Sequence, residues 1–371
     1  MIIESVAVYE LADVDVTPPP FRDIPSQVDV SLLRIDASDG ISGWSVLGSP
    51  HHALAELVRS LGPALVGENP LTTGRIHAFI ANRSLRKRFG RALVAAISAV
   101  DVALWDIKGK AFGQPVHHLL GGASDVVDVY VTFGAAAGTV YSGKQPYGLD
   151  ELAQEAAHLV AAGHRRLKVP VGRLERPDPV DDHRRIAAIR EAVGTDVTLA
   201  MDAASRFSLP QAHKLCALVE DLDIDFFEEP VSDNNPQLLA GLRAQTMVPI
   251  AAAATHRYSY LDLLRADAID IVQPNALSDG GYTAALEIVA LAKAFDRPIG
   301  HGNGTGPHNI ALQAAVSDYG IVEYHYHWWM LYNAVFDGVP QPENDRLVVS
   351  HEPGLGLLPR PEVVERYAVS R

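Results

Sequence analysis

Val197-Thr198-Leu199-Ala200-Met201-Asp202 is a short, mostly apolar run that ends in an acid. A helical pattern over residues 209–219 follows it, and the next apolar run, Phe226-Phe227-Glu228, ends in an acid as well. Runs of this length are typical of buried strands, because helices are usually longer. A strand, a helix and a second strand in this order predict a β/α unit with parallel strands.

The same alternation extends over most of the chain. Eight apolar runs that end in polar residues occupy residues 127–133, 166–169, 197–202, 226–228, 248–254, 269–273, 298–301 and 321–324. Helical patterns between them include residues 149–162, 180–193, 209–219 and 282–295. Eight β/α units in sequence predict an α/β protein with a closed parallel barrel of the TIM type, whose catalytic groups stand at the C-terminal ends of the strands.

A different pattern precedes the barrel. Apolar runs at residues 2–9, 28–35 and 42–47 predict an antiparallel meander, and residues 53–61, 71–81 and 93–111 have helical periodicity. The prolines of Thr17-Pro18-Pro19-Pro20 predict a loop, because proline cannot continue a ladder of strand hydrogen bonds. We therefore expect an α+β unit that closes at Gly121-Gly122.

Composition narrows the class of protein. The chain has 371 residues, 48% of them apolar and 20% charged, and a formal charge of −14, which argues against a nucleic-acid partner. No stretch is apolar enough to span a membrane, and the first residues lack the basic and apolar regions of a signal peptide. The single cysteine, Cys216, predicts a buried, inert thiol. These features together predict a cytoplasmic protein.

Asp202 and Glu228 end adjacent parallel strands, so their carboxylates are expected to face one barrel mouth. The same step along the chain, repeated once, reaches Ala254 rather than a third acid. Because clustered carboxylates repel one another, a positive group should lie among them. That group is either a hard cation such as Mg²⁺ or the side chain of Lys168, one strand back.

At this point the chain resembles the enolase superfamily, in its mandelate racemase/muconate lactonizing enzyme branch. The segment Ser98-Ala99-Val100-Asp101-Val102-Ala103-Leu104-Trp105-Asp106-Ile107-Lys108-Gly109-Lys110, followed by Leu119-Leu120-Gly121-Gly122, is similar to its domain junction. Further matches are Asp39-Gly40, Gly43-Trp44, Phe227-Glu228-Glu229-Pro230, Asp270-Ile271-Val272-Gln273-Pro274 and Pro353-Gly354-Leu355-Gly356.

The resemblance implies a fold and an activity. It implies a capping domain over residues 1–123, a barrel over residues 124–339 and a tail from about residue 340 that packs back on the cap. Family members use Mg²⁺ to bind a small carboxylate substrate, and a base removes the proton α to that carboxylate, which leads to dehydration or isomerisation of sugar acids. Cap loops, here residues 17–23 and 48–53, set specificity, and a homo-oligomer is the usual assembly.

Carried over residue by residue, the resemblance assigns two metal ligands, Asp202 and Glu228, and leaves the third position to Ala254. Lys168 matches the first of two lysines on the second strand, whereas Pro170 holds the position of the base. Ala204 occupies an alternative base position and is also inert.

The later strands also depart from the pattern. Asn275 replaces an aspartate that usually pairs with a histidine of the seventh strand, and either His301 or Gly302 holds that histidine position. Glu323 matches an acid of the eighth strand, and Glu229 matches a residue that supports the metal ligands. We name Lys168, His301, Asn275 and Glu323 as catalytic candidates.

Compared with the site that the resemblance implies, this chain lacks one carboxylate and one lysine. The remaining Asp202, Glu228 and Lys168 can form ion pairs with one another, so the affinity for Mg²⁺ is expected to be weakened or absent. A second possible metal site consists of Asp202, Glu228 and His256, a set that suits a transition metal better than Mg²⁺. The alternative is that His256 is an ordinary loop residue. Likewise, the aromatic cluster around His308, His325 and His327 either lines a pocket or packs a core or a subunit interface.

Three functions remain open. The first is a lyase or isomerase with His301 as its sole base. The second is a metal-independent enzyme that uses Lys168, His301 and the acids. The third is a binding or scaffold protein on the same fold.

Overall fold

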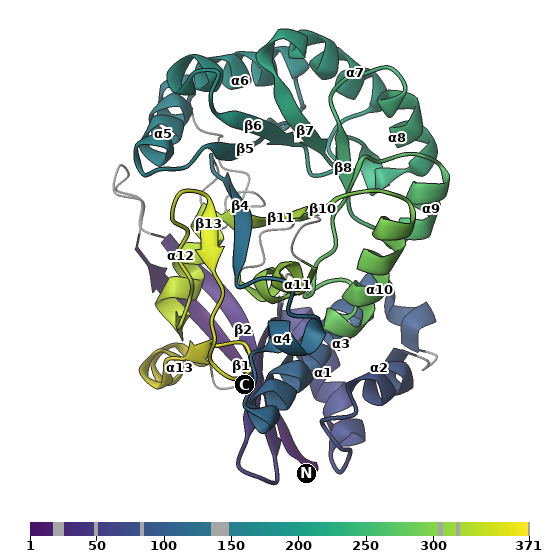
Figure 1. Ribbon diagram of the computed structural model, residues 1–371, viewed down its shortest axis with the longest axis vertical. Helices are drawn as coiled ribbons and strands as arrows, with labels where there is room; N and C mark the ends of the chain where they lie inside the picture. The colour runs from purple at the N-terminus through teal and green to yellow at the C-terminus, as the bar shows by residue number, and fades with distance from the viewer. Residues whose placement is uncertain are drawn as a thin grey trace.

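The computed structural model describes residues 1–17, 26–47, 51–81, 85–134, 148–302, 307–316 and 320–369. Figure 1 shows a barrel with helices around it and, below it, a cap that holds both chain termini. The expected barrel and the expected antiparallel cap sheet are both confirmed. Most of the cap loop at residues 17–23, and residues 48–50 of the second cap loop, lie outside the described residues.

The cap sheet is an antiparallel meander of β1 (Ile3–Val16), β2 (Ser26–Ala37) and β3 (Ser42–Leu47). β1 is longer than the predicted run because it continues through a register shift between Leu11 and Val14. Asp13 lies inside that shift with a φ of 54°. Such an irregularity breaks the two-residue alternation from which a strand is recognised in sequence.

Two helices of the cap, α1 (His51–Leu65) and α3 (Leu85–Phe112), pack on its sheet, and α2 (Thr73–Ala81) and α4 (Val116–Leu120) pack against α3. The long helix α3 approaches β3 so closely that a Cβ on Gly43 would lie 2.0 Å from the Ala103 carbonyl oxygen. It begins earlier than predicted and is kinked at Gly90, whose φ of 51° interrupts the helical pattern.

Eight parallel strands form the barrel, and pairing of β11 with β4 closes it. They are β4 (Val126–Thr132), β5 (Arg166–Pro170), β6 (Thr198–Asp202), β7 (Ile224–Glu228), β8 (Ile250–Ala252), β9 (Ile271–Val272), β10 (Ile299–His301) and β11 (Gly320–His325). The barrel interior is filled by inward-facing residues of β4, β6, β7 and β8, namely Tyr130, Ala200, Phe226 and Ala251. The polar strand ends lie above this filling.

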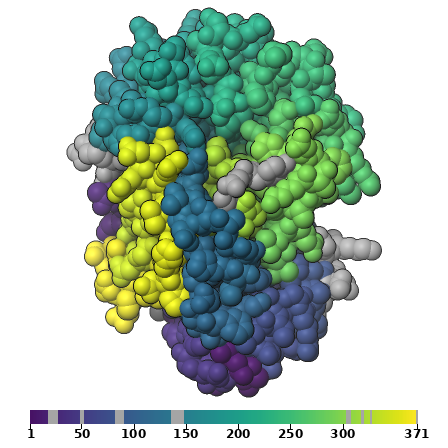
Figure 2. All heavy atoms as spheres, viewed as in Figure 1, coloured from purple at the N-terminus to yellow at the C-terminus, as the bar shows by residue number. Residues whose placement is uncertain are grey.

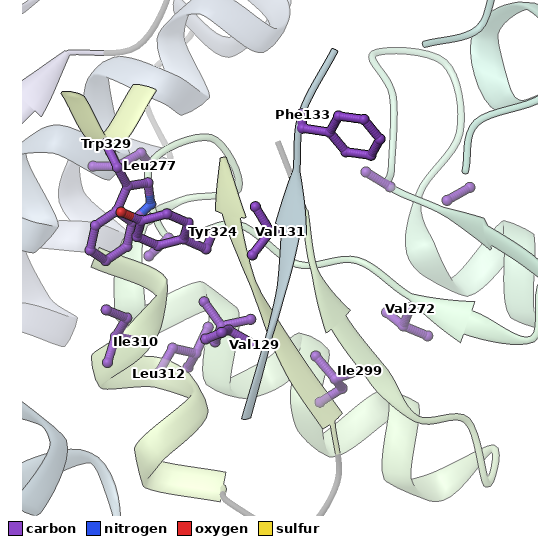
Figure 3. Packing of buried hydrophobic residues seen from close by; sticks show 14 of the residues in the cluster. Val129, Val131, Phe133, Val272, Leu277, Ile299, Ile310, Leu312, Tyr324 and Trp329 are labelled. Atoms are coloured by element: carbon purple, nitrogen blue, oxygen red, sulfur yellow. The ribbon is translucent and has the colours of Figure 1, made fainter. Parts of the chain in front are cut away.

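The helices of the barrel pack against the outward-facing strand residues. They are α5 (Leu149–Ala161), α6 (Pro179–Val193), α7 (Leu209–Leu218), α8 (Pro236–Arg243), α9 (Tyr260–Arg265), α10 (Gly281–Ala294), α11 (His308–Val316) and α12 (Tyr326–Val335), with 3₁₀ turns η1 (Glu220–Leu222) and η2 (Ser232–Asn234). Figure 3 shows this layer where Val129 and Val131 of β4 lie near Ile310 and Leu312 of α11.

The final segment contains β12 (Phe336–Asp337), β13 (Arg346–Val348), β14 (Leu358–Pro359) and α13 (Pro361–Tyr367). β13 pairs antiparallel with β4, the first barrel strand. The end of the chain returns to the cap, where Tyr367 Oη donates to Asp15 Oδ2 over 2.8 Å. Figure 2 shows this segment, in yellow, beside the junction between cap and barrel.

Within the described residues, none of the helices has the length and apolar character needed to cross a membrane. Cys216 is buried in α7, and burial raises the pKa of its thiol to about 11, in keeping with the predicted inert thiol.

Candidate functional site

Lys168 is the central residue of the barrel mouth. It projects inward from β5, fully buried, and its ammonium hydrogen-bonds to Glu228 Oε2 of β7 and lies 3.0 Å from Glu323 Oε1 of β11. Thr132 of β4 donates to the same Glu323 oxygen over 2.5 Å. The ammonium also lies 5.0 Å from the centre of the Tyr130 ring. Three of the predicted site residues are therefore brought together.

The charges of this cluster depend on one another. Burial alone would lower the pKa of Lys168, but Glu228 and Glu323 outweigh it and hold that pKa well above its ordinary value. Burial likewise works against the charged form of Glu323, but Lys168 keeps the pKa of this acid below its usual range. Burial raises the pKa of Glu228 to about 8 against the pull of Lys168. Lys168 and Glu323 therefore form the ionised pair.

Asp202, the other predicted metal ligand, lies at the end of β6 beside a second cation. Its Oδ2 is 3.6 Å from the guanidinium of Arg173, and its Oδ1 accepts the amide hydrogen of Ala204 over 2.7 Å. Arg173 follows β5 in the chain, and its Nε is buried without a hydrogen-bond partner among the described residues. Such a group is satisfied when a polar ligand or water reaches it.

A residue of the cap contacts Ala254, which stands at the position of the missing third acid. Arg91 of α3 donates a hydrogen bond to the carbonyl oxygen of Ala254 and lies 3.9 Å from Asp279 Oδ1. Burial and the charge of Asp202 raise the pKa of Glu229, while Asn234 and Arg91 lower it. A guanidinium thus contributes positive charge at the end of the fifth strand.

Gly302 and His301 lie on opposite faces of the seventh strand. A Cβ on Gly302 would lie 3.2 Å from Glu228 Oε1 and 2.9 Å from Gln273 Nε2, so position 302 faces the mouth. His301 is fully buried, and its Nδ1 lies 3.3 Å from the carbonyl oxygen of Pro274. Because side chains alternate along a strand, the imidazole faces away from Lys168.

This geometry corrects the expected placement of His301, which the structure does not bring together with the carboxylates. Burial lowers the pKa of His301 to about 4, so the ring is neutral in its buried position. Gly302 occupies the position from which a side chain would reach the mouth. The amide of Gln273 beside it is buried, and neither its oxygen nor its nitrogen has a partner in the described part of the chain.

Asn275, expected to hold the histidine, is buried and engaged with backbone. Its Nδ2 donates to the Gly302 carbonyl oxygen over 3.2 Å, and its Oδ1 accepts from Leu277 N over 2.8 Å. Asn275 thus fixes the loop that carries Gly302. In the aromatic cluster near the end of the barrel, the side chains of Tyr324 and Trp329 are buried, and their ring centres lie 4.3 Å apart, as in a packed core. The side chain of His327 lies outside the described part of the chain.

The donor set for a divalent cation is incomplete at the mouth. In the described residues, no three histidine, cysteine or acidic side chains of the mouth converge within 4.8 Å. His256, the rival third ligand, is exposed and accepts a hydrogen bond from Arg257 over 3.2 Å. Mg²⁺ takes about six oxygen ligands in near-octahedral geometry. Asp202 and Glu228, each beside a cationic side chain, do not supply such a set by themselves.

Sequence reasoning missed Arg91, Arg173 and Gln273. Arg91 belongs to another domain, so no pattern along the barrel points to it. Gln273 carried a usable signal, because it ends a strand run in the same way as Asp202 and Glu228 do.

Comparison with known proteins identifies the family. Residues 21–121 match the mandelate racemase/muconate lactonizing enzyme N-terminal domain, and residues 151–363 match the enolase C-terminal domain-like family. Over 351 residues the chain is 32% identical to an arabinonate dehydratase of Saccharolobus solfataricus, covering 92% of this chain and 91% of that protein.

Solved structures agree with this. A 3,6-anhydro-D-galactonate cycloisomerase from Zobellia galactanivorans superposes with a TM-score of 0.86 at 28% identity, over 100% of both chains. An L-talarate dehydratase from Polaromonas sp. JS666, complexed with Mg and L-glucarate, superposes with a TM-score of 0.82 at 25% identity, over 100% of this chain and 98% of the other.

Proposed function

The chain belongs to the mandelate racemase/muconate lactonizing enzyme branch of the enolase superfamily, and from that premise we propose that it is a sugar-acid lyase or isomerase whose site works without a tightly bound divalent metal. The observation that carries the proposal is the Lys168 ammonium, which lies between Glu228 and Glu323. Carboxylates paired in this way need no added cation to offset their repulsion.

The metal ligands that remain support weak Mg²⁺ binding or none. Glu228 Oε2 accepts a hydrogen bond from Lys168, and Asp202 lies beside Arg173. A bound cation would have to compete with both of these side chains, and Ala254 offers it no carboxylate in return. No step of the proposed reaction therefore passes through a metal.

The unpartnered polar groups of the mouth support a polar, oxygen-rich ligand. Arg173 is a cation with a free buried N–H, suited to the carboxylate of a sugar acid. The Gln273 amide has both a donor and an acceptor to offer to hydroxyl groups. The substrate class that fits both groups is a small polyhydroxylated carboxylic acid or its lactone.

Glu228 is the proton-transfer group in this proposal. Its Oε1 lies beside Gly302, while its Oε2 is held by Lys168. In its ionised form, which predominates above its pKa of about 8, the carboxylate takes the proton from the carbon α to the substrate carboxylate and returns it to the departing hydroxyl, which leaves as water. The fixed charges of Lys168 and Arg173 lie where negative charge develops on the substrate.

Nuclear magnetic resonance in deuterium oxide tests this proposal on a library of sugar acids and lactones, with the protein treated with a chelator. We expect exchange of the α-proton or loss of water that added Mg²⁺ does not increase. Glu228→Gln should abolish it, whereas Glu287→Gln, an exposed substitution on the outer helix α10, should leave it unchanged. Activity that disappears with the chelator and returns with Mg²⁺ would overturn the proposal, as would tight stoichiometric Mg²⁺ in elemental analysis.

A non-catalytic sugar-acid-binding protein is the second candidate. It is favoured by Pro170 and Gly302, which put no titratable group at two strand ends where the family resemblance implies a base. Calorimetry on the same compounds separates the two functions. Saturable binding without exchange or water loss supports the second candidate, and Gly302→Ala should then weaken binding about tenfold or more, because its Cβ would displace the Gln273 amide.

A further inference from the structure

A cluster of histidines lies at the opposite end of the barrel from Lys168. His117 and His118 of α4 direct their Nε2 atoms toward one carboxylate oxygen, Asp125 Oδ1, at 3.2 Å and 3.4 Å. Asp125 comes just before β4, and the seven residues of this strand separate it by about 20 Å from the mouth. The ring of His351 lies 6.3 Å from that of His117 and 6.2 Å from that of His118.

Hydrogen bonding alone does not satisfy this arrangement while the ring of His118 is neutral and the Gln114 amide oxygen faces it. His118 has acceptor oxygens at both ring nitrogens, because its Nδ1 lies 3.4 Å from Gln114 Oε1. A neutral imidazole has only one N–H to donate. A metal ion at Nε2 resolves the conflict, since Nδ1 then donates to Gln114, the outer partner that metal-bound histidines usually have.

The distances also match metal coordination. Ligands about 2.0–2.1 Å from a tetrahedral zinc ion lie about 3.3–3.4 Å from one another. The two distances to Asp125 Oδ1, 3.2 Å and 3.4 Å, agree with this spacing. All three ligand atoms lie within 4.8 Å of one another.

We propose that His117, His118 and Asp125 bind a divalent transition metal of the zinc type, with the ring of His351 beside the site. Two imidazoles and a carboxylate suit such a metal better than Mg²⁺ or Ca²⁺.

The site joins three parts of the chain. His117 and His118 lie at the end of the cap, Asp125 leads into the barrel, and His351 belongs to the tail that follows β13. Hydrogen bonds from Val349 N to Asp125 O (2.8 Å) and from Val116 N to Gly354 O (2.8 Å) hold these segments together. Figure 2 shows the junction and the tail side by side on one face. The metal therefore serves as a structural cross-link, separate from the mouth.

Calorimetric titration of the full chain with Zn²⁺ tests the proposal. We expect about one saturable Zn²⁺ site per chain and a rise in melting temperature when it is filled. His118→Ala and Asp125→Asn, both at accessible side chains, should each raise the Kd at least about tenfold and abolish the rise. His256→Ala, an exposed histidine at the mouth, should change neither.

Two results would overturn the assignment. The first is a wild-type chain whose Zn²⁺ binding is no tighter than that of His118→Ala. The second is a Zn²⁺ site that persists in both cluster variants but disappears in Asp202→Asn, which would move the metal to the mouth. Circular dichroism of each variant establishes that lost binding is not lost folding.

Discussion

Lys168 shows how one residue determines the character of a site. Its side chain is fully buried, and burial of a lone ammonium is costly. It stays charged because Glu228 and Glu323 contact it from strands on either side. Each carboxylate in turn depends on the lysine, since both acids are buried as well. Removal of the lysine leaves both acids buried without a cation.

We predict that Lys168→Met lowers the free energy of unfolding by about 3–5 kcal/mol at pH 8, because it leaves Glu228 and Glu323 buried without their cation. Both acids then have pKa values above those of the unfolded chain. Their folded forms bind more protons, so the stability loss should shrink as the pH falls toward 5. Urea unfolding at the two pH values measures this.

The double variant Lys168→Met, Glu228→Gln provides the control. It removes one of the two orphaned charges, so it should recover part of the lost stability at pH 8. If the single variant is as stable as the wild type at both pH values, the ion pairs do not have the importance assigned to them here.

At the level of elements, the contact between α3 of the cap and α10 of the barrel depends on Asp101. Its carboxylate accepts the Thr283 amide over 3.0 Å and the Thr283 hydroxyl over 2.6 Å. The approach is close, because a Cβ on Gly281 would lie 2.2 Å from Asp101 Oδ2. Burial raises the pKa of Asp101 to about 7, although the hydrogen bonds from Thr283 oppose the shift.

This shift predicts a pH dependence. Because the folded pKa of about 7 exceeds the unfolded value of 3.8, the contribution of Asp101 is fully present below pH 3.8 and is lost as the pH rises through 7. Asp101→Asn removes the titration, so its stability relative to the wild type should rise by up to about 1.4 kcal/mol per pH unit between pH 5 and 7. Denaturant unfolding across this range checks it, and parallel curves for the two proteins would contradict it.

The sequence predicted regular elements well and irregular ones poorly. β6 and β7 end at Asp202 and Glu228, as their apolar runs predicted, and β5 ends one residue after its predicted end, at Pro170. The end of β1 and the start of α3 were missed, because the register shift near Asp13 and the kink at Gly90 break the expected periods. Periodicity reports only regular local geometry, and neither a register shift nor a residue with positive φ inside a helix has such a period.

The site was predictable only in part, for a related reason. Asp202, Glu228 and Lys168 follow from the pattern of the barrel strands, and Glu323 followed from the family resemblance. A shift of one residue turns a side chain to the opposite face, so His301 and Gly302 could not be told apart from sequence. Arg91 reaches the mouth from the cap, and that contact depends on how the two domains pack.

At the scale of the whole molecule, Asp106 of α3 joins the cap sheet, the long helix and the tail. Its Oδ2 accepts the Trp44 amide hydrogen over 2.9 Å and the Lys110 ammonium over 2.6 Å, and its Oδ1 accepts the Leu355 amide hydrogen over 2.9 Å. The carboxylate is fully buried, and burial raises its pKa against the pull of Lys110. Cap and tail thus share one acceptor.

We predict that Asp106→Ala costs about 2–4 kcal/mol, because it removes the acceptor of two part-buried amide hydrogens and leaves the Lys110 ammonium with only the Ser42 carbonyl oxygen. The loss should appear first in the tail, since Leu355 has this carboxylate as its amide acceptor. Hydrogen exchange followed by mass spectrometry should show faster exchange in peptides over residues 349–369 and 42–47. Asp337→Asn removes an exposed ion pair with Arg360 in the same tail and should leave exchange nearly unchanged. If Asp106→Ala accelerates exchange in the cap sheet and leaves the tail protected, the tail is anchored by its strand pairing with β4 rather than by this carboxylate.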